Sequence, residues 1–322
     1  MNTYKTARVL VFIGVAFASL SAILIRLADA PPLVIAFYRM LFTSIMLAPV
    51  LLTRAGSRRD RQSPERSLST PRTVGLLAGS GAFLALHFAT WNASLSYTTV
   101  ASSVVLVTLH PIFVAVGSVL FLREHVPPSA FGFIVLAIVG SGILSYGDIA
   151  LGPEAMLGNA LAVAGAISVA GYMLLGRFLR RHVTALSYNW SVYTVAALIL
   201  LPAALLAGNP LGGYAPVEFA IFAALALFCT VLGHSIFNWA LKYVSASSVS
   251  TSILLEPVFA TLMALVIFEE VPGVAALVGG LIVVASLYMV IRLEHTAGSP
   301  LTSRSRQSGL QQSGNGDHSA AL

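Results

Sequence analysis

The sequence predicts an all-α integral membrane protein with ten transmembrane helices, arranged as two inverted five-helix repeats. Three observations predict this class: long apolar runs, an internal repeat and an uneven distribution of positive charge. Of the 322 residues, 57% are hydrophobic and only 9% are charged, and the mean hydropathy is +0.87. Such a composition is typical of a membrane protein and excludes an ordinary soluble domain.

Ten runs are long enough to cross a bilayer core of about 30 Å, which takes roughly 20 helical residues. The runs are continuously apolar rather than alternating, which favours helices over a β-barrel. The first run follows Lys5 and Arg8 and lacks a small-residue cleavage site, so we expect an uncleaved helix. The one cysteine, Cys229, lies inside a span, so no intrachain disulfide is expected. The predicted spans cover residues 9–27, 32–53, 73–95, 99–122, 129–147, 156–176, 185–206, 218–240, 245–268 and 273–291.

An internal repeat relates the two halves of the chain. Adding 146 to the 33 positions from Asn92 to Glu124 gives an identical residue at eight of them, without a gap. Each copy holds five spans, an odd number, so the copies must cross the membrane in opposite directions. We therefore predict a first repeat at 1–147, a second at 148–292 and a disordered cytoplasmic tail at 293–322. The identical pairs are Asn92 and Asn238, Leu95 and Leu241, Tyr97 and Tyr243, Ser102 and Ser248, Leu109 and Leu255, Pro111 and Pro257, Phe113 and Phe259, and Glu124 and Glu270.

Positive charge indicates the orientation. Sixteen of the 18 Lys and Arg residues fall in segments on the side of the N-terminus, Arg26 falls on the other side, and Arg39 lies within a span. The positive-inside rule then predicts that both termini are cytoplasmic, and we expect the bacterial inner membrane. This topology, rather than nucleic-acid binding, explains the net charge of +6.

Polar side chains inside the spans are the candidate functional residues. Arg39 lies about two turns into the second span, where an arginine is costly and needs a partner. The third span carries a polar stripe at helical spacing, with Trp91 and Asn92 alongside. The members of that stripe are Ser80, His87, Thr90 and Ser94.

His110 and Glu256 occupy equivalent positions in the fourth and ninth spans. Each precedes a proline, Pro111 or Pro257, that removes a backbone donor and kinks the helix. An ionisable residue at a kink suits the lining of a cavity better than a lipid-facing surface. Ser252 lies on the same helical face as Glu256.

A third polar stripe follows the eighth span and consists of Thr230, His234 and Asn238. If the third, fourth, eighth and ninth spans pack centrally, the stripes meet in a polar interior. Small polar residues, histidines and tryptophans also serve in helix packing, and Arg39 could be a structural clamp, so both interpretations stay open. The predicted substrate-binding residues are Glu256, His110, Arg39, His87, His234, Asn92, Asn238, Trp91 and Ser252, with no metal site and no cofactor.

The two copies resemble the repeat of EamA-like proteins in the drug/metabolite transporter superfamily. The segments Asn92–Glu124 and Asn238–Glu270 share with it an asparagine near a helix end, a small Ser/Ala-rich entry, Pro-x-Phe within the helix and a closing acidic residue. Pro31–Pro32 followed by Arg39 resembles the family's second helix, whereas His110 departs from the less polar residue expected there. The resemblance spans 9–292. It implies a ten-helix permease with a central substrate cavity that moves small metabolites such as amino acids, often outward.

The predicted function is a secondary transporter that exports a small polar metabolite, such as an amino acid, by alternating access. The expected partners are that small molecule, a coupling proton and membrane lipid. The alternatives are a passive channel or facilitator and a membrane-embedded enzyme. The enzyme is disfavoured because the sequence has no His-Glu-x-x-His motif, no Gly-rich phosphate loop and no paired aspartates in a span.

Reporter fusions test the opposed orientation of the repeats. Ser96 follows the third span and its repeat mate Lys242 follows the eighth. We expect a fusion at Ser96 to report the periplasmic side and one at Lys242 the cytoplasmic side. Equal signals from one side at both positions would contradict the inverted repeat.

Overall fold

Helices make up all the regular structure in the part of the chain that is described. A computed structural model describes residues 3–55, 70–122, 128–179, 183–234, 236 and 253–297. The elements are α1 (Thr3–Leu27), α2 (Pro32–Ala55), α3 (Pro71–Ser94), α4 (Val100–Val107), α5 (His110–Leu122), α6 (Pro128–Asp148), the 3₁₀ turn η3 (Ile149–Leu151), α7 (Pro153–Leu179), α8 (Ala185–Leu206), α9 (Pro216–Ala224), the π-helical η4 (Leu225–His234), α12 (Glu256–Phe268) and α13 (Val274–Ala297). The all-α membrane class predicted from the sequence is confirmed over these residues.

Within the described ranges, nine helical segments are long and apolar enough to span a bilayer. α4 and α5 together form one of these segments, from Val100 to Phe121, and α9 with η4 forms another, from Pro216 to Gly233. The predicted span at 245–268 is described only in its second part, the short apolar helix α12. α13 continues to Ala297, past the predicted repeat boundary at 292, and residues 298–322 lie outside the described part.

Prolines and threonines determine where many helices begin. Proline is favoured in the first helical turn because its missing N–H is not needed there. A threonine before the first turn accepts a hydrogen bond from a free backbone N–H, as Thr70, Thr99 and Thr184 do. The helices that begin with proline are α2, α3, α6, α7 and α9.

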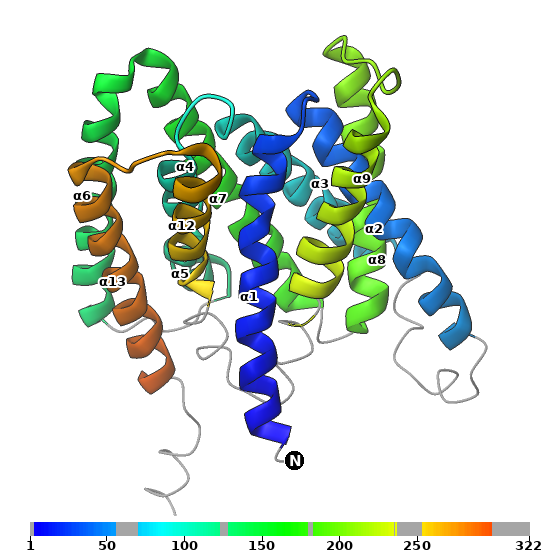
Figure 1. The fold of residues 1–322 in the computed structure, drawn as a ribbon. Helices are drawn as coiled ribbons and strands as arrows, with labels where there is room; N and C mark the ends of the chain where they lie inside the picture. Colours follow the sequence, from blue (N-terminus) through cyan, green and yellow to red (C-terminus); the bar gives the residue numbers. More distant parts are fainter. Residues whose placement is uncertain are drawn as a thin grey trace, which may run out of the picture.

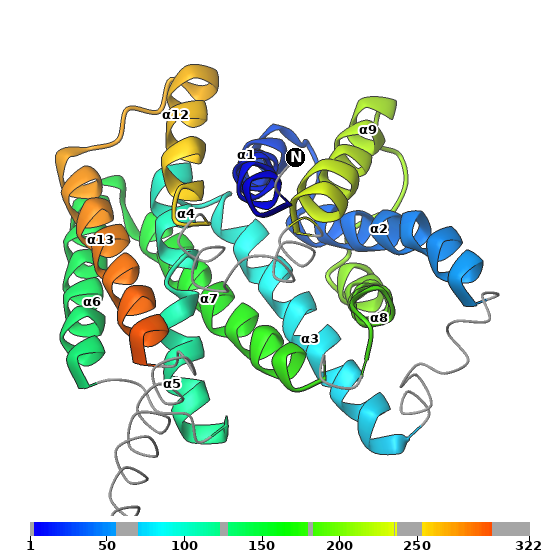
Figure 2. The same ribbon diagram turned by 90° about the horizontal axis from the view of Figure 1, so that it is seen from below.

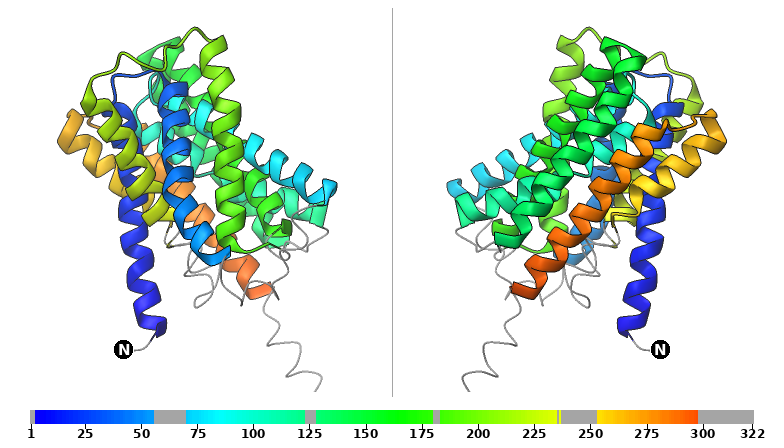
Figure 3. Two further views of the ribbon diagram at one scale, coloured as in Figure 1. Left: turned by 90° about the vertical axis from the view of Figure 1, so that its right-hand side faces the viewer. Right: turned by 90° about the vertical axis from the view of Figure 1, so that its left-hand side faces the viewer.

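The helices run up and down between two faces of the bundle (Figure 1). α1 begins and α13 ends at the same face, which is at the bottom of Figures 1 and 3. We call this the lower face, and the opposite end, where α1 ends at Leu27, the upper face. The upper face carries the short links from α1 to α2, from α6 to α7 and from α12 to α13.

Helices distant in sequence lie side by side (Figure 2). α6 packs against α13 at one end of the bundle, and α2 packs against α8 at the other. Between them α3 crosses α7, while α1 packs against η4 and α12, and α12 packs against α4. The bundle is therefore held together mainly by contacts between residues before 148 and residues after it.

Glycines allow the closest of these approaches. A Cβ on Gly140 of α6 would lie 2.9 Å from the Gly279 carbonyl oxygen, and a Cβ on Gly279 would lie 2.5 Å from the Gly140 carbonyl oxygen. On α7, Gly171 leaves room for the Phe83 ring of α3, which a Cβ would approach to 2.7 Å. Small residues at a crossing let the helix backbones approach, which supplies the van der Waals packing that joins helices in lipid.

The helix through the fourth span is interrupted. α4 ends at Val107, a turn occupies Thr108 and Leu109, and α5 begins at His110. The same pattern occurs 146 residues later, where a turn at Leu254 and Leu255 precedes α12. α5 and α12 are both 13 residues long, and each has proline as its second residue.

The crossing of α6 and α13 can be tested with a matched pair of substitutions on α6. We expect Gly140→Val to destabilise the protein by about 1–3 kcal/mol, because the added carbons overlap α13. Gly142→Val is the control, because a Cβ there meets nothing within 4 Å. Thermal unfolding of the purified protein in detergent measures both. Equal melting temperatures would show that this crossing is not close.

Candidate functional site

Arg39 on α2 is fully buried and lies where four elements meet. Its exposed fraction is 1%. Nη1 donates to Ser21 Oγ of α1 at 2.7 Å, and Nε donates to Thr230 Oγ1 of η4 at 2.9 Å. The guanidinium also lies over the Phe88 ring of α3, 4.4 Å from its centre. An arginine is suited to such a position because its planar head donates several hydrogen bonds and stacks on aromatic rings.

The π-helical register of η4 helps to present Thr230 to Arg39. Thr230 Oγ1 donates to the Leu225 carbonyl, five residues earlier, at 3.2 Å. That bond directs the hydroxyl lone pairs away from the η4 backbone, where one accepts from Arg39. π-helical segments are rare and often occur at functional sites, so this part of the eighth span is a candidate point of movement.

His110 and Glu256 lie at the start of α5 and α12, next to the two helix interruptions. Both are half-buried. His110 Nδ1 lies 3.3 Å from the Val107 carbonyl at the end of α4. Among the described residues, no ion pair joins Glu256 to Arg39.

The residues predicted on α3 lie at helix contacts. His87 Nδ1 is 2.9 Å from the Gly165 carbonyl of α7, and the imidazole stacks on Trp91 with ring centres 5.8 Å apart. Asn92 Nδ2 donates to the Pro32 carbonyl at the start of α2, at 3.3 Å. These contacts support the packing interpretation for His87 and Asn92.

Among the described residues, three buried polar side-chain atoms have no hydrogen-bond partner. They are Trp91 Nε1, Asn92 Oδ1 and Ser102 Oγ. Buried polar atoms in proteins are nearly always satisfied, so these three are unusual. Trp91 and Asn92 therefore combine a packing contact with a buried polar atom that has no partner among the described residues.

Part of the predicted site lies outside the described residues. This holds for Asn238 and Ser252, and for the side chain of His234. Their predicted roles stay predictions. The same is true of the expectation that the chain holds no metal or cofactor, although the described residues bring no three His, Cys, Asp or Glu side chains together as a metal site would.

Sequence reasoning did not identify the partners of Arg39. Ser21 is one of two serines in an apolar run, and Phe88 resembles any core aromatic, so neither carries a signal in sequence. It also missed a tyrosine cluster between α3, α7 and α8. There the Ser80 and Tyr188 hydroxyls are 2.7 Å apart, and Tyr188 stacks on Tyr172 with ring centres 6.0 Å apart.

Comparison with known proteins gives one family. The model of the EamA-like transporter family matches the chain twice, over residues 5–146 and 156–292. An uncharacterized transporter of Archaeoglobus fulgidus is 26% identical over 280 residues, which cover 84% of this chain and 91% of that protein. The uncharacterized inner membrane transporter YhbE of Escherichia coli K12 is 28% identical over 239 residues, 71% of this chain and 70% of that protein.

A relative with a named substrate and a solved structure are also similar. The pseudopaline exporter CntI of Pseudomonas aeruginosa is 23% identical over 269 residues, which cover 82% of this chain and 88% of that protein. A crystal structure aligns with a TM-score of 0.60 at 18% identity, over 92% of this chain and 99% of the other. At that identity the structural likeness shows the fold alone.

The Arg39 contacts can be tested by stability. We expect Arg39→Lys to destabilise the protein by about 1–3 kcal/mol, because an ammonium cannot reproduce two hydrogen bonds and the ring contact together. Thermal unfolding in detergent measures the loss. Arg72→Lys, at an exposed position at the start of α3, is the control.

A double variant separates the Thr230 contact from general damage. If Arg39 and Thr230 interact, the double variant Arg39→Lys with Thr230→Val should lose less stability in total than the sum of the losses of the two single variants. Strict additivity would contradict the contact.

Proposed function

Since the chain belongs to the EamA-like transporter family, we propose that it is a secondary transporter that exports a small polar metabolite, an amino acid or a related compound. In this proposal ten helices form two inverted repeats around a central cavity, and the cavity opens to each side of the membrane in turn. One relative, the pseudopaline exporter CntI, is named for export, which supports the outward direction.

The paired helix interruptions are the observation that carries the proposal. Turns at Thr108–Leu109 and Leu254–Leu255 lie 146 residues apart, and each precedes a 13-residue helix that begins with an ionisable residue and a proline. In transporters built of inverted repeats, interrupted helices near the membrane midplane form the substrate and ion sites. The interruptions thus support a site between His110 and Glu256.

The packing of the helices supports the inverted repeat. If the first five spans correspond in order to the last five, exchanging the halves should turn each helix contact into another. The contact of α3 with α7 then corresponds to that of η4 with α1, and the contact of α4 with α7 to that of α12 with α1. The contacts of α2 with α8, of α4 with α12 and of α6 with α13 each correspond to themselves. The two separate family matches agree with the proposed repeats at 1–147 and 148–292.

The placement of charge supports a cytoplasmic lower face. α1, which begins at this face, carries Lys5 and Arg8 in its first two turns, whereas acidic residues lie at the upper ends of α6, α9 and α12. The inner-membrane name of the Escherichia coli relative supports a location in the bacterial inner membrane. In this orientation Asp148, Glu218 and Glu270 lie on the periplasmic side.

The proposed mechanism assigns different roles to the ionisable residues. Glu256 binds the substrate amine or a coupling proton, because its carboxyl has no hydrogen-bond partner among the described residues and lies at a helix interruption. His110 modulates Glu256 from the equivalent position. Arg39, with its contacts to Ser21 and Thr230, holds α1, α2 and η4 together and contributes positive charge near Glu256.

Comparison of metabolites identifies the substrate. Cells that lack the protein should retain a small polar metabolite that cells overproducing it release, and proteoliposomes should then transport that compound with saturation. Transport that never saturates and needs no coupling ion would favour a passive facilitator. Chemical conversion of the compound by the purified protein would favour an enzyme.

The role of Glu256 is tested in the same proteoliposomes. We expect Glu256→Gln to lower the transport rate by on the order of tenfold, equivalent to ~1.4 kcal/mol, and to flatten its dependence on pH. Glu269→Gln is the matched control, because it removes an exposed carboxylate at the other end of α12. An unchanged rate and pH profile in Glu256→Gln would exclude the proton role.

A further inference from the structure

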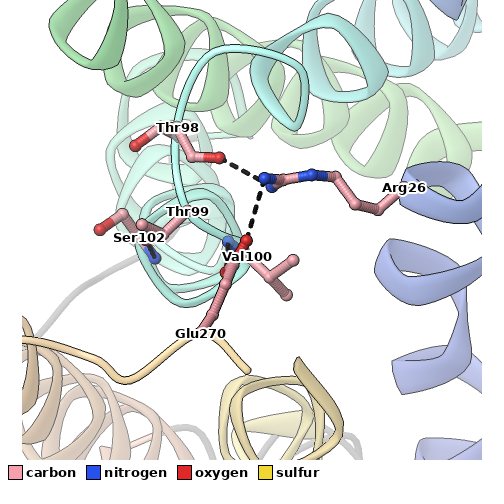
Figure 4. Close-up of polar contacts among 6 residues, drawn as sticks. All are labelled: Arg26, Thr98, Thr99, Val100, Ser102 and Glu270. Atoms are coloured by element: carbon pink, nitrogen blue, oxygen red, sulfur yellow. Dashed lines mark hydrogen bonds and ion pairs between the residues drawn. The ribbon is translucent and has the colours of Figure 1, made fainter. Parts of the chain in front are cut away.

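Polar contacts gather at the upper face, where α1, α4 and α12 meet. Arg26 at the end of α1 forms an ion pair with Glu270, with Nη2 and Oε1 2.9 Å apart. Its Nη1 donates to the Thr98 carbonyl at 3.1 Å. Figure 4 shows the guanidinium between the link that precedes α4 and the end of α12.

Glu270 uses its second oxygen on α4. Oε2 accepts from the Val100 backbone N–H, the first of α4, at 3.0 Å. Thr99 caps the same helix end by accepting from the Ser102 N–H at 3.1 Å. A carboxylate at a helix N-terminus is stabilised by the free N–H groups and the helix dipole. One side chain from beyond α12 thus contacts both α1 and α4 (Figure 4).

The backbone before Glu270 holds it in place. Glu269 has the left-handed angle φ 56°, which ends α12, and both Glu269 and Glu270 donate their N–H groups to the Ala264 carbonyl. Such a conformation is uncommon for a residue other than glycine. Arg26 also lies over the ring of Phe268, the last residue of α12, at 5.9 Å. The end of α12 is therefore attached to α1 by two contacts, the ion pair and the ring.

A second chain of hydrogen bonds secures the segment that Glu270 contacts. Thr98 Oγ1 donates to Asn159 Oδ1 of α7 at 3.0 Å, and Asn159 Nδ2 donates to Asp148 Oδ2 at 2.8 Å. A Cβ on Gly158 would lie 2.9 Å from the Thr98 backbone nitrogen, so α7 touches this segment directly. The link before α4 is thereby fixed to α6 and α7, while α12 reaches it through Glu270.

We propose that the contacts of Glu270 with Arg26 and with the start of α4 form a latch that keeps the upper end of the transport pathway closed. The latch joins a residue beyond α12 to two helices of the first repeat, so moving the repeats apart at the upper face must break it. This inference rests on the proposed function, since it names the element that opens in alternating access.

The strength of the latch suits reversible opening. Arg26 and Glu270 are 34% and 20% exposed, so water reaches both charges and can replace the ion pair when it breaks. The hydrogen bond from Thr98 to Asn159 also joins the first repeat to the second, so it must break or rearrange together with the ion pair. The latch therefore holds the closed state by a modest margin.

Thiol labelling tests the latch without a known substrate. Val104 is 1% exposed and lies one turn beyond Val100 on the same face of α4. We would introduce Val104→Cys in a Cys229→Ala background, which removes the one native cysteine, and add a membrane-impermeant maleimide to the upper face of oriented proteoliposomes. Glu270→Gln should raise the labelling rate at position 104 about fivefold, as expected for losing one partly exposed ion pair.

Three further variants make the result specific. Arg26→Gln should raise the labelling rate to a similar extent. The double variant Arg26→Gln with Glu270→Gln should label about as fast as the faster of the two single variants, because both substitutions remove the same ion pair. Glu269→Gln, the neighbouring exposed carboxylate, should leave the rate unchanged. An unchanged rate in Glu270→Gln, or an equal increase in Glu269→Gln, would overturn the latch.

A crosslink provides a second measurement that does not depend on the stability of those variants. With Arg26→Cys and Glu270→Cys joined by a cleavable bifunctional thiol reagent, transport should stop and should return on cleavage. Full transport in the crosslinked protein would also overturn the latch. If the unmodified protein transports nothing, the proposed function fails, while the labelling series still decides whether these residues close the upper face.

Discussion

A charge buried within a bilayer must find its partners inside the protein, and the position of Arg39 satisfies that constraint. Hydrocarbon offers no water, so an unpartnered guanidinium would be costly at this depth. Arg39 obtains hydroxyls from α1 and η4 and an aromatic face from α3, and each partner comes from a different element. The positions of four spans thus depend on one side chain. Any movement of η4 relative to α2 must either carry Thr230 along or replace it, which links the π-helical segment to the rest of the fold.

Much of the fold follows from the sequence because a bilayer restricts what a chain can do. Apolar length alone predicts the spans, since backbone groups in lipid must be satisfied within a helix. The eighth span shows where this reasoning ends. Its residues are as apolar as those of the other spans, and nothing in their pattern predicts the π register of η4 or the contact of Thr230 with Arg39, which forms only when the helices pack.

The candidate site was only partly predictable for the same reason. The repeat identified His110 and Glu256 because a symmetric pattern in sequence marks equivalent places in space. The partners of Arg39 and the contacts of Glu270 depend on which helices become neighbours. A single serine or a glutamate in a loop does not predict, from sequence, which helix it will contact. His87 illustrates the ambiguity of helical spacing, which fits a polar interior and helix packing equally well; its Nδ1 lies 2.9 Å from the Gly165 carbonyl of a neighbouring helix.

The fold pairs its helices nearly symmetrically, but its charges are not symmetric, and this difference bears on direction. Two identical inverted halves would make the states open to either side equal in energy, because exchanging the halves converts one state into the other. Here α2 carries Arg39, whereas α8, its counterpart in the proposed repeat, has no charged residue. His110 likewise has Glu256, a residue of different charge, as its equivalent in the proposed second repeat. In the proposed alternating-access mechanism, a buried positive charge in one half and a carboxyl in the other make the two states chemically different, so a coupling proton or a charged substrate favours one of them. In that mechanism the asymmetry lies in the ionisable side chains, while the helices that carry them rock about a shared axis.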